Sequence, residues 1–386
     1  VISINLITGE IEWEKNLNKK DSPELIYAPW GGASFDPIRE VIYTTTGNPK
    51  PTFNGVNRPG DNEYANSVIA INANTGEIQW SFQEIKHDIW NLDIAAGPLL
   101  TTIKDKESNS NIEVVVAATK AGNLFILDRE SGRNIHPTNY VSVSSSKRKG
   151  ENTAEKQIFQ TFPEPFSKQN FDTEDITNIS KERYDYVFNQ IVNENFGYLV
   201  PHEKDKKSIY FGIHGGAQWP GASINPFTNE IYIASSHIPW ILEFYEDDSS
   251  FDVLEYQQLL DNYGYPGSKP PWGSLSSYDL NTGNKLWSIP FGEYEELSSM
   301  GIDITGTENF GGPTSTSGDV IFITGTRDKK LYAFNSKNGE KLWEHKMPHH
   351  GSAPPTVFSY EDKQYIFIQS SGGGKLSQFD PLDKST

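Results

Sequence analysis

The sequence predicts an all-β protein, a β-propeller of four-stranded antiparallel blades, and three observations support this fold. A strand–turn–strand phrase ending in Trp recurs, a second hairpin phrase alternates with it, and glycine and proline are spread along the chain. The 32 Gly and 23 Pro residues suit many turns better than a helix bundle. With 386 residues, 12 % of them aromatic, the chain can build a large core, and we expect residues 1–386 to form a single propeller domain.

The first repeated phrase is an alternating strand, an Asn/Asp-x-x-x-Gly turn and a short strand that ends in Trp. Its copies occupy residues 1–13, 68–80, 274–287 and 330–343, with a degenerate copy at 123–135. Glycine in the turn supplies a positive φ, and the indole suits packing between adjacent sheets. We therefore expect the four tryptophans of these copies to be packing residues: Trp13, Trp80, Trp287 and Trp343.

The second phrase is a hairpin with an Asp-Pro or Asn-Pro turn, at residues 33–47 and 222–235. Its alternation with the first phrase gives four strands to a repeat. That period is typical of a propeller rather than a solenoid.

One polar stretch, from about 144 to 207, breaks the repeat pattern. Apolar residues at mostly helical spacing predict a helix within 174–195. We interpret the stretch as an insertion between blades that covers one face of the disc, with a solvated surface loop as the alternative.

Composition excludes several classes of protein. The net charge of −18 argues against a nucleic-acid partner, because phosphate backbones would be repelled. No apolar run approaches the length of a membrane span, and the absence of Cys excludes disulfides and thiolate sites. Val1 stands inside a strand-like pattern with no initiator Met, so we expect the protein to extend further at its amino end.

Polar and aromatic clusters lie between the repeats, where the loops of a propeller converge on one end of its axis. They include residues 29–32, 46–49, 87–93, 119–122, 214–220 and 308–313. In this order they resemble the quinoprotein dehydrogenases, eight-bladed propellers that use pyrroloquinoline quinone (PQQ). The phrases at 264–283, 306–334 and 353–374 resemble the membrane-type glucose dehydrogenase branch. The resemblance covers nearly the whole chain except the insertion, and it implies that this chain carries an incomplete ring.

The resemblance implies roles for individual residues. Trp30 would stack on the quinone, and Lys120 would hydrogen-bond the quinone oxygens and stabilise their negative charge on reduction. Gln218 and Phe310 resemble further contacts at the cofactor rim. Asn48 and Asn91 would offer amide oxygens to Ca²⁺, with Mg²⁺ as the alternative ion. Blades before Val1 would supply an acidic metal ligand and more cofactor contacts.

The chain departs from the family at Asn91, where the His-Asp-x-Trp phrase is usually followed by Asp. An amide can ligate a metal, but it cannot accept the proton of a substrate hydroxyl. Asp93, which shares a face with Asn91 in an extended segment, is our candidate base, and Asp88 is an alternative.

The resemblance implies a dehydrogenase that oxidises a sugar or alcohol hydroxyl and passes electrons to a membrane quinone or a cytochrome. It also implies a periplasmic or cell-surface location, with attachment to the inner membrane through segments before Val1. Two other functions stay open. One is a non-catalytic propeller scaffold, favoured by Asn91, and the other is a sugar-binding module that uses Trp219, Trp240 and Trp272 as stacking platforms.

Overall fold

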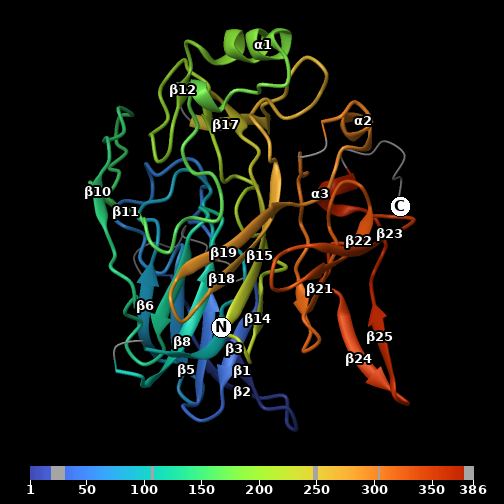
Figure 1. Cartoon of the computed structure of the whole chain (residues 1–386). Helices are drawn as coiled ribbons and strands as arrows, with labels where there is room; N and C mark the ends of the chain where they lie inside the picture. The colour runs from blue at the N-terminus through green and yellow to red at the C-terminus, as the bar shows by residue number, and fades with distance from the viewer. Residues whose placement is uncertain (19–30, 106–107, 247–250, 303–304, 378–386) are drawn as a thin grey trace.

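The computed structural model describes residues 1–18, 31–105, 108–246, 251–302 and 305–377. Figure 1 shows β-sheets arranged in an arc, with a smaller layer of strands and helix α1 (Lys181–Ile191) above it. Most of these sheets are antiparallel and four of them have four strands. The predicted all-β propeller architecture is confirmed.

The sheets of the arc follow the sequence repeats. In chain order they are β1–β2 (Ile2–Ile4, Ile11–Glu14); β3–β6 (Ala33–Asp36, Val41–Thr45, Ser67–Asn72, Ile78–Gln83); β7–β9 (Leu99–Lys104, Asn111–Ala118, Leu124–Asp128); β14–β15–β18–β19 (Ser223–Asn225, Glu230–Ser236, Gly273–Asp279, Asn284–Pro290); β20–β23 (Thr314–Ser315, Val320–Ile323, Lys330–Asn335, Lys341–Lys346); and β24–β25 (Thr356–Tyr360, Lys363–Phe367).

Buried side chains join three successive pairs of sheets in the arc. Tyr43 of β4 shares a core cluster with Phe125 of β9. Val116 of β8 shares one with Ile233 of β15, and Leu275 of β18 shares one with Ile323 of β21. The spatial neighbour of β7–β9 is thus the sheet β14–β15–β18–β19, and the intervening chain leaves the arc.

Three of the repeat tryptophans fasten neighbouring sheets together. The Nε1 atoms of Trp13, Trp80 and Trp287 donate to backbone carbonyls in the next turn, of Ala73, Arg129 and Ser336, at 2.8, 3.1 and 2.9 Å. The turn glycines have φ near +70°, and a Cβ on any of them would lie within 2.8 Å of the indole. Glycine is required there both for its backbone conformation and to admit the ring.

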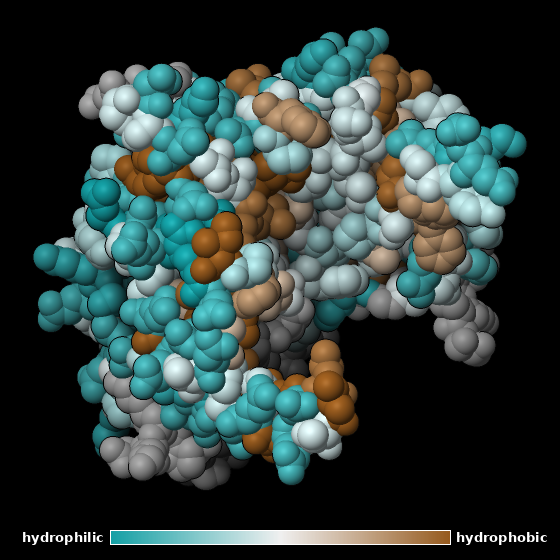
Figure 2. Space-filling model, turned by 90° about the horizontal axis from the view of Figure 1, so that it is seen from below, coloured by the Kyte–Doolittle hydropathy of each residue, from teal (hydrophilic) through white to brown (hydrophobic). Residues whose placement is uncertain are grey.

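Trp343 differs from the other three, because 49 % of its surface is exposed and its ring stacks on His345. The prediction that it packs between sheets is wrong for the described residues. The two ends of the arc also carry exposed apolar side chains: Ile2, Ile4 and Ile11 on the first hairpin, Phe358, Tyr365 and Phe367 on the last. Figure 2 shows the corresponding open outline, with a wide notch and hydrophobic residues beside it.

A separate layer covers the arc. It contains the sheet β12–β13–β16–β17 (Asn195–Phe196, Ser208–Tyr210, Trp240–Glu246, Phe251–Gln258), which we call the accessory sheet and in which β12 and β13 are parallel. The remaining elements are β10 (Tyr140–Ser142), β11 (Lys156–Ile158), the 3₁₀ helix η1 (Thr173–Asp175), α1 (Lys181–Ile191), α2 (Glu295–Ser298) and α3 (Gly374–Ser377). The expected insertion, 144–207, runs through β11, η1, α1 and β12.

The predicted helix is present but shorter than 174–195, because Ser180 caps its start by accepting from the Arg183 amide. Val187 and Ile191 of α1 pack on Ile209 and Ile241 of the accessory sheet. The second half of this sheet, β16–β17, is a further insertion between β15 and β18 that the repeat analysis did not predict. No helix among the described residues is long and apolar enough to cross a membrane.

Candidate functional site

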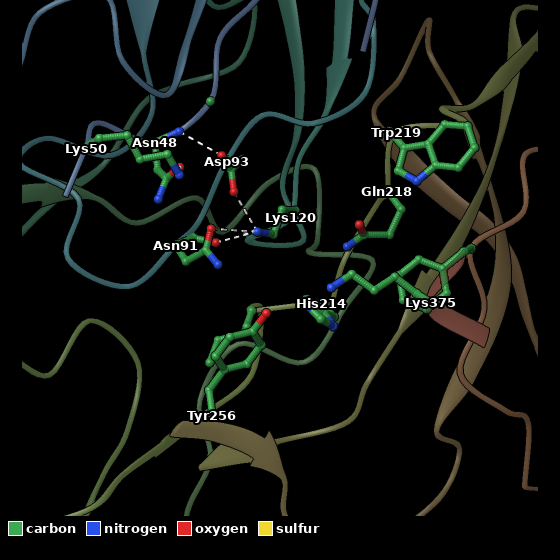
Figure 3. A pocket seen from close by; sticks show the side chains of 13 residues that line it. Asn48, Lys50, Asn91, Asp93, Lys120, His214, Gln218, Trp219, Tyr256 and Lys375 are labelled. Atoms are coloured by element: carbon green, nitrogen blue, oxygen red, sulfur yellow. Dashed lines mark hydrogen bonds and ion pairs between the residues drawn. The ribbon is translucent and has the colours of Figure 1, made fainter. Parts of the chain in front are cut away.

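A cavity of about 510 Å³ lies where the loops of the arc meet the accessory sheet (Figure 3). Its volume falls within the roughly 300–1,000 Å³ of small-molecule sites. One side, which we call the polar wall, consists of Asn48, Lys50, Asn91, Asp93 and Lys120. The other side, the aromatic wall, consists of His214, Gln218, Trp219, Tyr256, Phe310 and Lys375.

The buried ion pair of Lys120 and Asp93 is the centre of the polar wall. Lys120 Nζ lies 2.6 Å from Asp93 Oδ2 and also donates to the backbone oxygen and Oδ1 of Asn91, at 2.6 and 3.2 Å. Asp93 Oδ1 accepts a hydrogen bond from the backbone N–H of Asn48 at 2.7 Å. Since a buried charge is tolerated only when it is paired and hydrogen-bonded, these contacts hold the wall together.

A tight turn aims Asn91 and Asp93 at the cavity. The buried Asp88 carboxylate accepts the amides of Trp90 and Leu92 at 2.7 and 2.8 Å, and Asn91 adopts a φ of +63°, which asparagine tolerates. Trp90 and Leu92 point into the core shared with the accessory sheet. Burial raises the pKa of Asp88, which does not line the cavity, and its bonds give it a structural role.

Lys50 adds a second ammonium group to the polar wall. Its Nζ donates to Asn48 Oδ1 at 3.0 Å and to Thr52 Oγ1 at 2.9 Å. The Asn48 side chain is buried, and its Nδ2 has no hydrogen-bond partner. A buried, unpaired amide at a cavity wall is a donor available to a ligand.

His214 is the centre of the aromatic wall. Its ring lies against Trp240, Tyr256 and Phe310, with centroids 4.3, 5.8 and 6.1 Å away. Burial, aided by the positive charges of Lys120 and Lys375, lowers the pKa of His214 to about 3. The imidazole is therefore neutral at physiological pH, and its buried Nδ1 has no partner.

A buried carboxyl supports this wall from behind. Glu308 precedes Phe310 by two residues and accepts from Gln258 Nε2 at 2.9 Å. Burial raises its pKa to about 7. Gln258 lies two residues after the cavity-lining Tyr256 on β17, so its hydrogen bond to Glu308 ties the segment of Phe310 to the strand of Tyr256.

The structure brings six of the seven candidate residues of the sequence to this one cavity. Asn48, Asn91, Asp93, Lys120, Gln218 and Phe310 all line it. Trp30 lies outside the described residues. Gln218 donates to the Gly215 carbonyl at 2.9 Å, which fixes its amide at the rim.

Sequence reasoning missed Lys50, His214, Tyr256 and Lys375. Lys50 stands two residues after Asn48 and His214 opens a cluster already singled out, so each could have been found by its position. Tyr256 and Lys375 reach the cavity from β17 and α3, and no local signal marks them.

Two of the three tryptophans expected to serve as sugar-stacking platforms are buried. Trp240 and Trp272 are 4 % and 0 % exposed, so neither ring can stack on a sugar. Trp240 packs on His214, and Trp272 packs on Tyr294. Trp219, 40 % exposed and on the cavity lining, is the one member of the three that a ligand can reach.

The chain is similar to known proteins over most of its length. Residues 5–366 match the family model described as PQQ glucose/ethanol/alcohol dehydrogenase, β-propeller domain. The chain is 29 % identical to quinoprotein glucose dehydrogenase A of Acinetobacter calcoaceticus, covering 90 % of this chain and 47 % of the relative. It is 28 % identical to the quinoprotein glucose dehydrogenase of Escherichia coli, covering 96 % and 51 %. The chain thus spans about half the length of these curated relatives.

Solved structures support the same architecture. The quinohemoprotein alcohol dehydrogenase of Comamonas testosteroni aligns with a TM-score of 0.61 at 21 % identity, over 95 % of this chain and 51 % of the other. At this identity the likeness shows the fold alone. Because the family model covers most of the chain, the protein belongs to the PQQ-type glucose/ethanol/alcohol dehydrogenase β-propeller family.

Proposed function

We propose that this chain forms part of a PQQ-dependent dehydrogenase that oxidises a hydroxyl of a sugar or alcohol. The observation that carries the proposal is the convergence of Lys120, Asp93, Asn91 and Asn48 on one cavity. PQQ is a flat aromatic tricarboxylate. Three lysines and an aromatic wall are complementary to such a molecule in charge and shape.

Each residue then has a role in holding the cofactor. Lys120, fixed by Asp93 and Asn91, presents a positive charge toward the quinone oxygens. Phe310 and Gln218 border the ring at the rim, and the unpaired Asn48 Nδ2 and His214 Nδ1 are free to bond its polar edge. Trp30 is proposed as the stacking indole on the strength of the family resemblance.

Asp93 is the proposed base, because it is the one carboxylate among the described residues that line the cavity. Asn91 cannot take this role, since an amide does not accept a proton at neutral pH. Bound PQQ would supply a quinone that takes up the hydride from the substrate carbon. Asp93 would receive the hydroxyl proton, so that the substrate leaves as a carbonyl compound.

Ca²⁺ or Mg²⁺, with Asn48 and Asn91 as ligands, is the metal that the family resemblance implies. The donor chemistry of the described residues fits such an ion poorly. Asn48 Oδ1 accepts from Lys50, and Asn91 Oδ1 accepts from Lys120. Calcium takes six to eight oxygens, several of them carboxylate oxygens, and Asp93 alone offers a carboxylate here.

Substrate, acceptor and location extend the proposal. Similar proteins are named glucose, quinate and glycerol dehydrogenases, so a hydroxyl flanked by others is the substrate class that we propose. We propose a membrane quinone or a cytochrome as the electron acceptor and a periplasmic or cell-surface location, on the family resemblance.

The test is a PQQ titration of the full-length protein, followed by Trp fluorescence and by dye reduction with glucose, quinate and glycerol. Quenching with dye reduction is the expected result. Quenching without turnover on any hydroxyl substrate would favour a propeller that has lost its base at Asn91. Sugar binding without quinone binding would favour the sugar-binding module.

A further inference from the structure

We propose that the cavity holds its quinone cofactor without a divalent cation, and that the Lys50 ammonium supplies the positive charge of the missing ion. This inference rests on the proposed function. It begins from Asn48, whose side-chain oxygen is the position expected to ligate a metal. That oxygen is the acceptor of Lys50 Nζ, 3.0 Å away.

The second expected ligand set is also occupied by lysine. Lys120 Nζ donates to the backbone oxygen and Oδ1 of Asn91 and to Asp93 Oδ2. Asp93 Oδ1 accepts a hydrogen bond from the backbone N–H of Asn48. Every candidate ligand oxygen on the polar wall therefore already accepts an N–H. Across the ranges that the structure describes, no three His, Cys, Asp or Glu side chains gather as a metal site.

Charge leads to the same conclusion. The cavity lining carries three lysines, Lys50, Lys120 and Lys375, against the single carboxylate of Asp93. A divalent ion bound at Asn48 would lie beside two ammonium groups with one counter-charge, and their repulsion would oppose its binding. A ligand with several carboxylates, by contrast, is attracted by the excess positive charge of the three lysines.

The local sequence keeps Lys50 at this oxygen. Lys50 stands between Pro49 and Pro51, whose rings fix φ and restrict the residue before them. Two of its three N–H bonds go to Asn48 and Thr52, so the third can reach a ligand carboxylate. An ammonium at this position gives charge and a hydrogen bond, as a metal would, but asks for no further oxygen ligands.

The test measures PQQ affinity by Trp fluorescence quenching in the full-length protein. The titration is run in buffer treated with EDTA, and again after addition of Ca²⁺ or Mg²⁺. We expect saturable binding in EDTA and a Kd that changes by less than about twofold when either ion is added. Elemental analysis of the PQQ-loaded protein should find less than one divalent ion per chain.

Variants separate the role of Lys50 from general packing. Lys50→Gln keeps a donor for Asn48 but loses the charge, and should weaken PQQ binding in EDTA by about 10- to 100-fold. Lys50→Asp adds a carboxylate beside Asn48 and should make binding depend on Ca²⁺. The matched control is Lys337→Gln, an exposed lysine that pairs with Asp319 and does not line the cavity.

Two results would overturn the inference. Wild-type protein that binds PQQ only when Ca²⁺ or Mg²⁺ is present would show that a metal is required, which needs no variant to observe. Unchanged affinity of a folded Lys50→Gln protein in EDTA would remove Lys50 from the site. Failure to bind PQQ under every condition would instead contradict the proposed function itself.

Discussion

The two walls of the cavity are built in different ways, although they face the same space (Figure 3). The polar wall comes from loops that follow strands β4, β6 and β8, and its residues bond one another through buried charges. The aromatic wall is assembled from the loop after β13, strand β17, the segment before β20 and helix α3, and its side chains mainly pack.

This difference predicts different responses to substitution. Removing one member of the polar wall leaves a buried charge or donor unpaired, which is costly. Removing one member of the aromatic wall takes away contact area, and neighbouring rings can adjust. Chemistry and stability should depend mainly on the first wall, and substrate fit mainly on the second.

The largest expected effect is on turnover in Asp93→Asn. With the proposed base gone, kcat should fall by about 10²- to 10⁴-fold at saturating PQQ, while fluorescence still reports cofactor binding. Dye-reduction kinetics give the measurement. Asp61→Asn, which disrupts the exposed pair with Lys86, is the control and should keep full turnover. A normal kcat in Asp93→Asn would mean that another group accepts the proton.

Stability should respond most to Lys120→Met. The change leaves the Asp93 carboxylate buried without its ion-pair partner, so the free energy of unfolding should fall by about 3–5 kcal/mol. Urea denaturation measures the loss. Lys86→Met removes an exposed ion pair and should cost less than about 1 kcal/mol. Equal losses in the two variants would contradict the idea that the polar wall is an interdependent unit.

His214 of the aromatic wall should make the free energy of unfolding depend on pH. His214 has a pKa of about 3 in the folded protein and about 6.5 in the unfolded chain. Between these two pH values the unfolded chain binds a proton at His214 and the folded protein does not. Its contribution to stability is therefore complete above pH 6.5 and declines as the pH falls toward 3.

His214→Phe keeps the ring packing and removes this titration. The fall in unfolding free energy between pH 6.5 and 4 should become shallower by up to about 1.4 kcal/mol per pH unit. Denaturant unfolding at a series of pH values measures the slope. His345→Phe, on an exposed side chain, should leave the slope as in the wild type. An unchanged slope in His214→Phe would show that His214 is not buried as a neutral ring.

The same contrast explains what the sequence could predict. The propeller architecture followed from repeats, because each repeat carries its own alternation, turn glycine and tryptophan. The polar wall apart from Lys50 followed from the resemblance, since its residues lie in short clusters at repeat junctions. The loop conformation of 87–93, fixed by Asp88, could not be predicted, because it depends on the buried partner Asn66 and on the core under Trp90.

Two residues of the aromatic wall, Tyr256 and Lys375, were beyond the sequence for a physical reason. Tyr256 belongs to an inserted hairpin whose pairing with β13 is set by tertiary contact, and Lys375 comes from a helix near the far end of the chain. The sequence did not reveal the burial of Trp240 and Trp272, because a large aromatic residue in a loop-like stretch can be either exposed or part of a core. Their burial comes from the accessory sheet and from Tyr294.

The smallest effect is expected at the rim, in Trp219→Ala. The indole is exposed at the cavity and can stack on a sugar ring, an interaction of about 1 kcal/mol, so KM for a sugar substrate should rise roughly fivefold while kcat stays the same. Steady-state dye reduction separates the two constants. Trp343→Ala, which removes another exposed indole outside the cavity lining, should change neither. A fall in kcat at constant KM would place Trp219 at the reacting atoms. It would contradict the idea that the polar wall serves chemistry and the aromatic wall serves substrate fit.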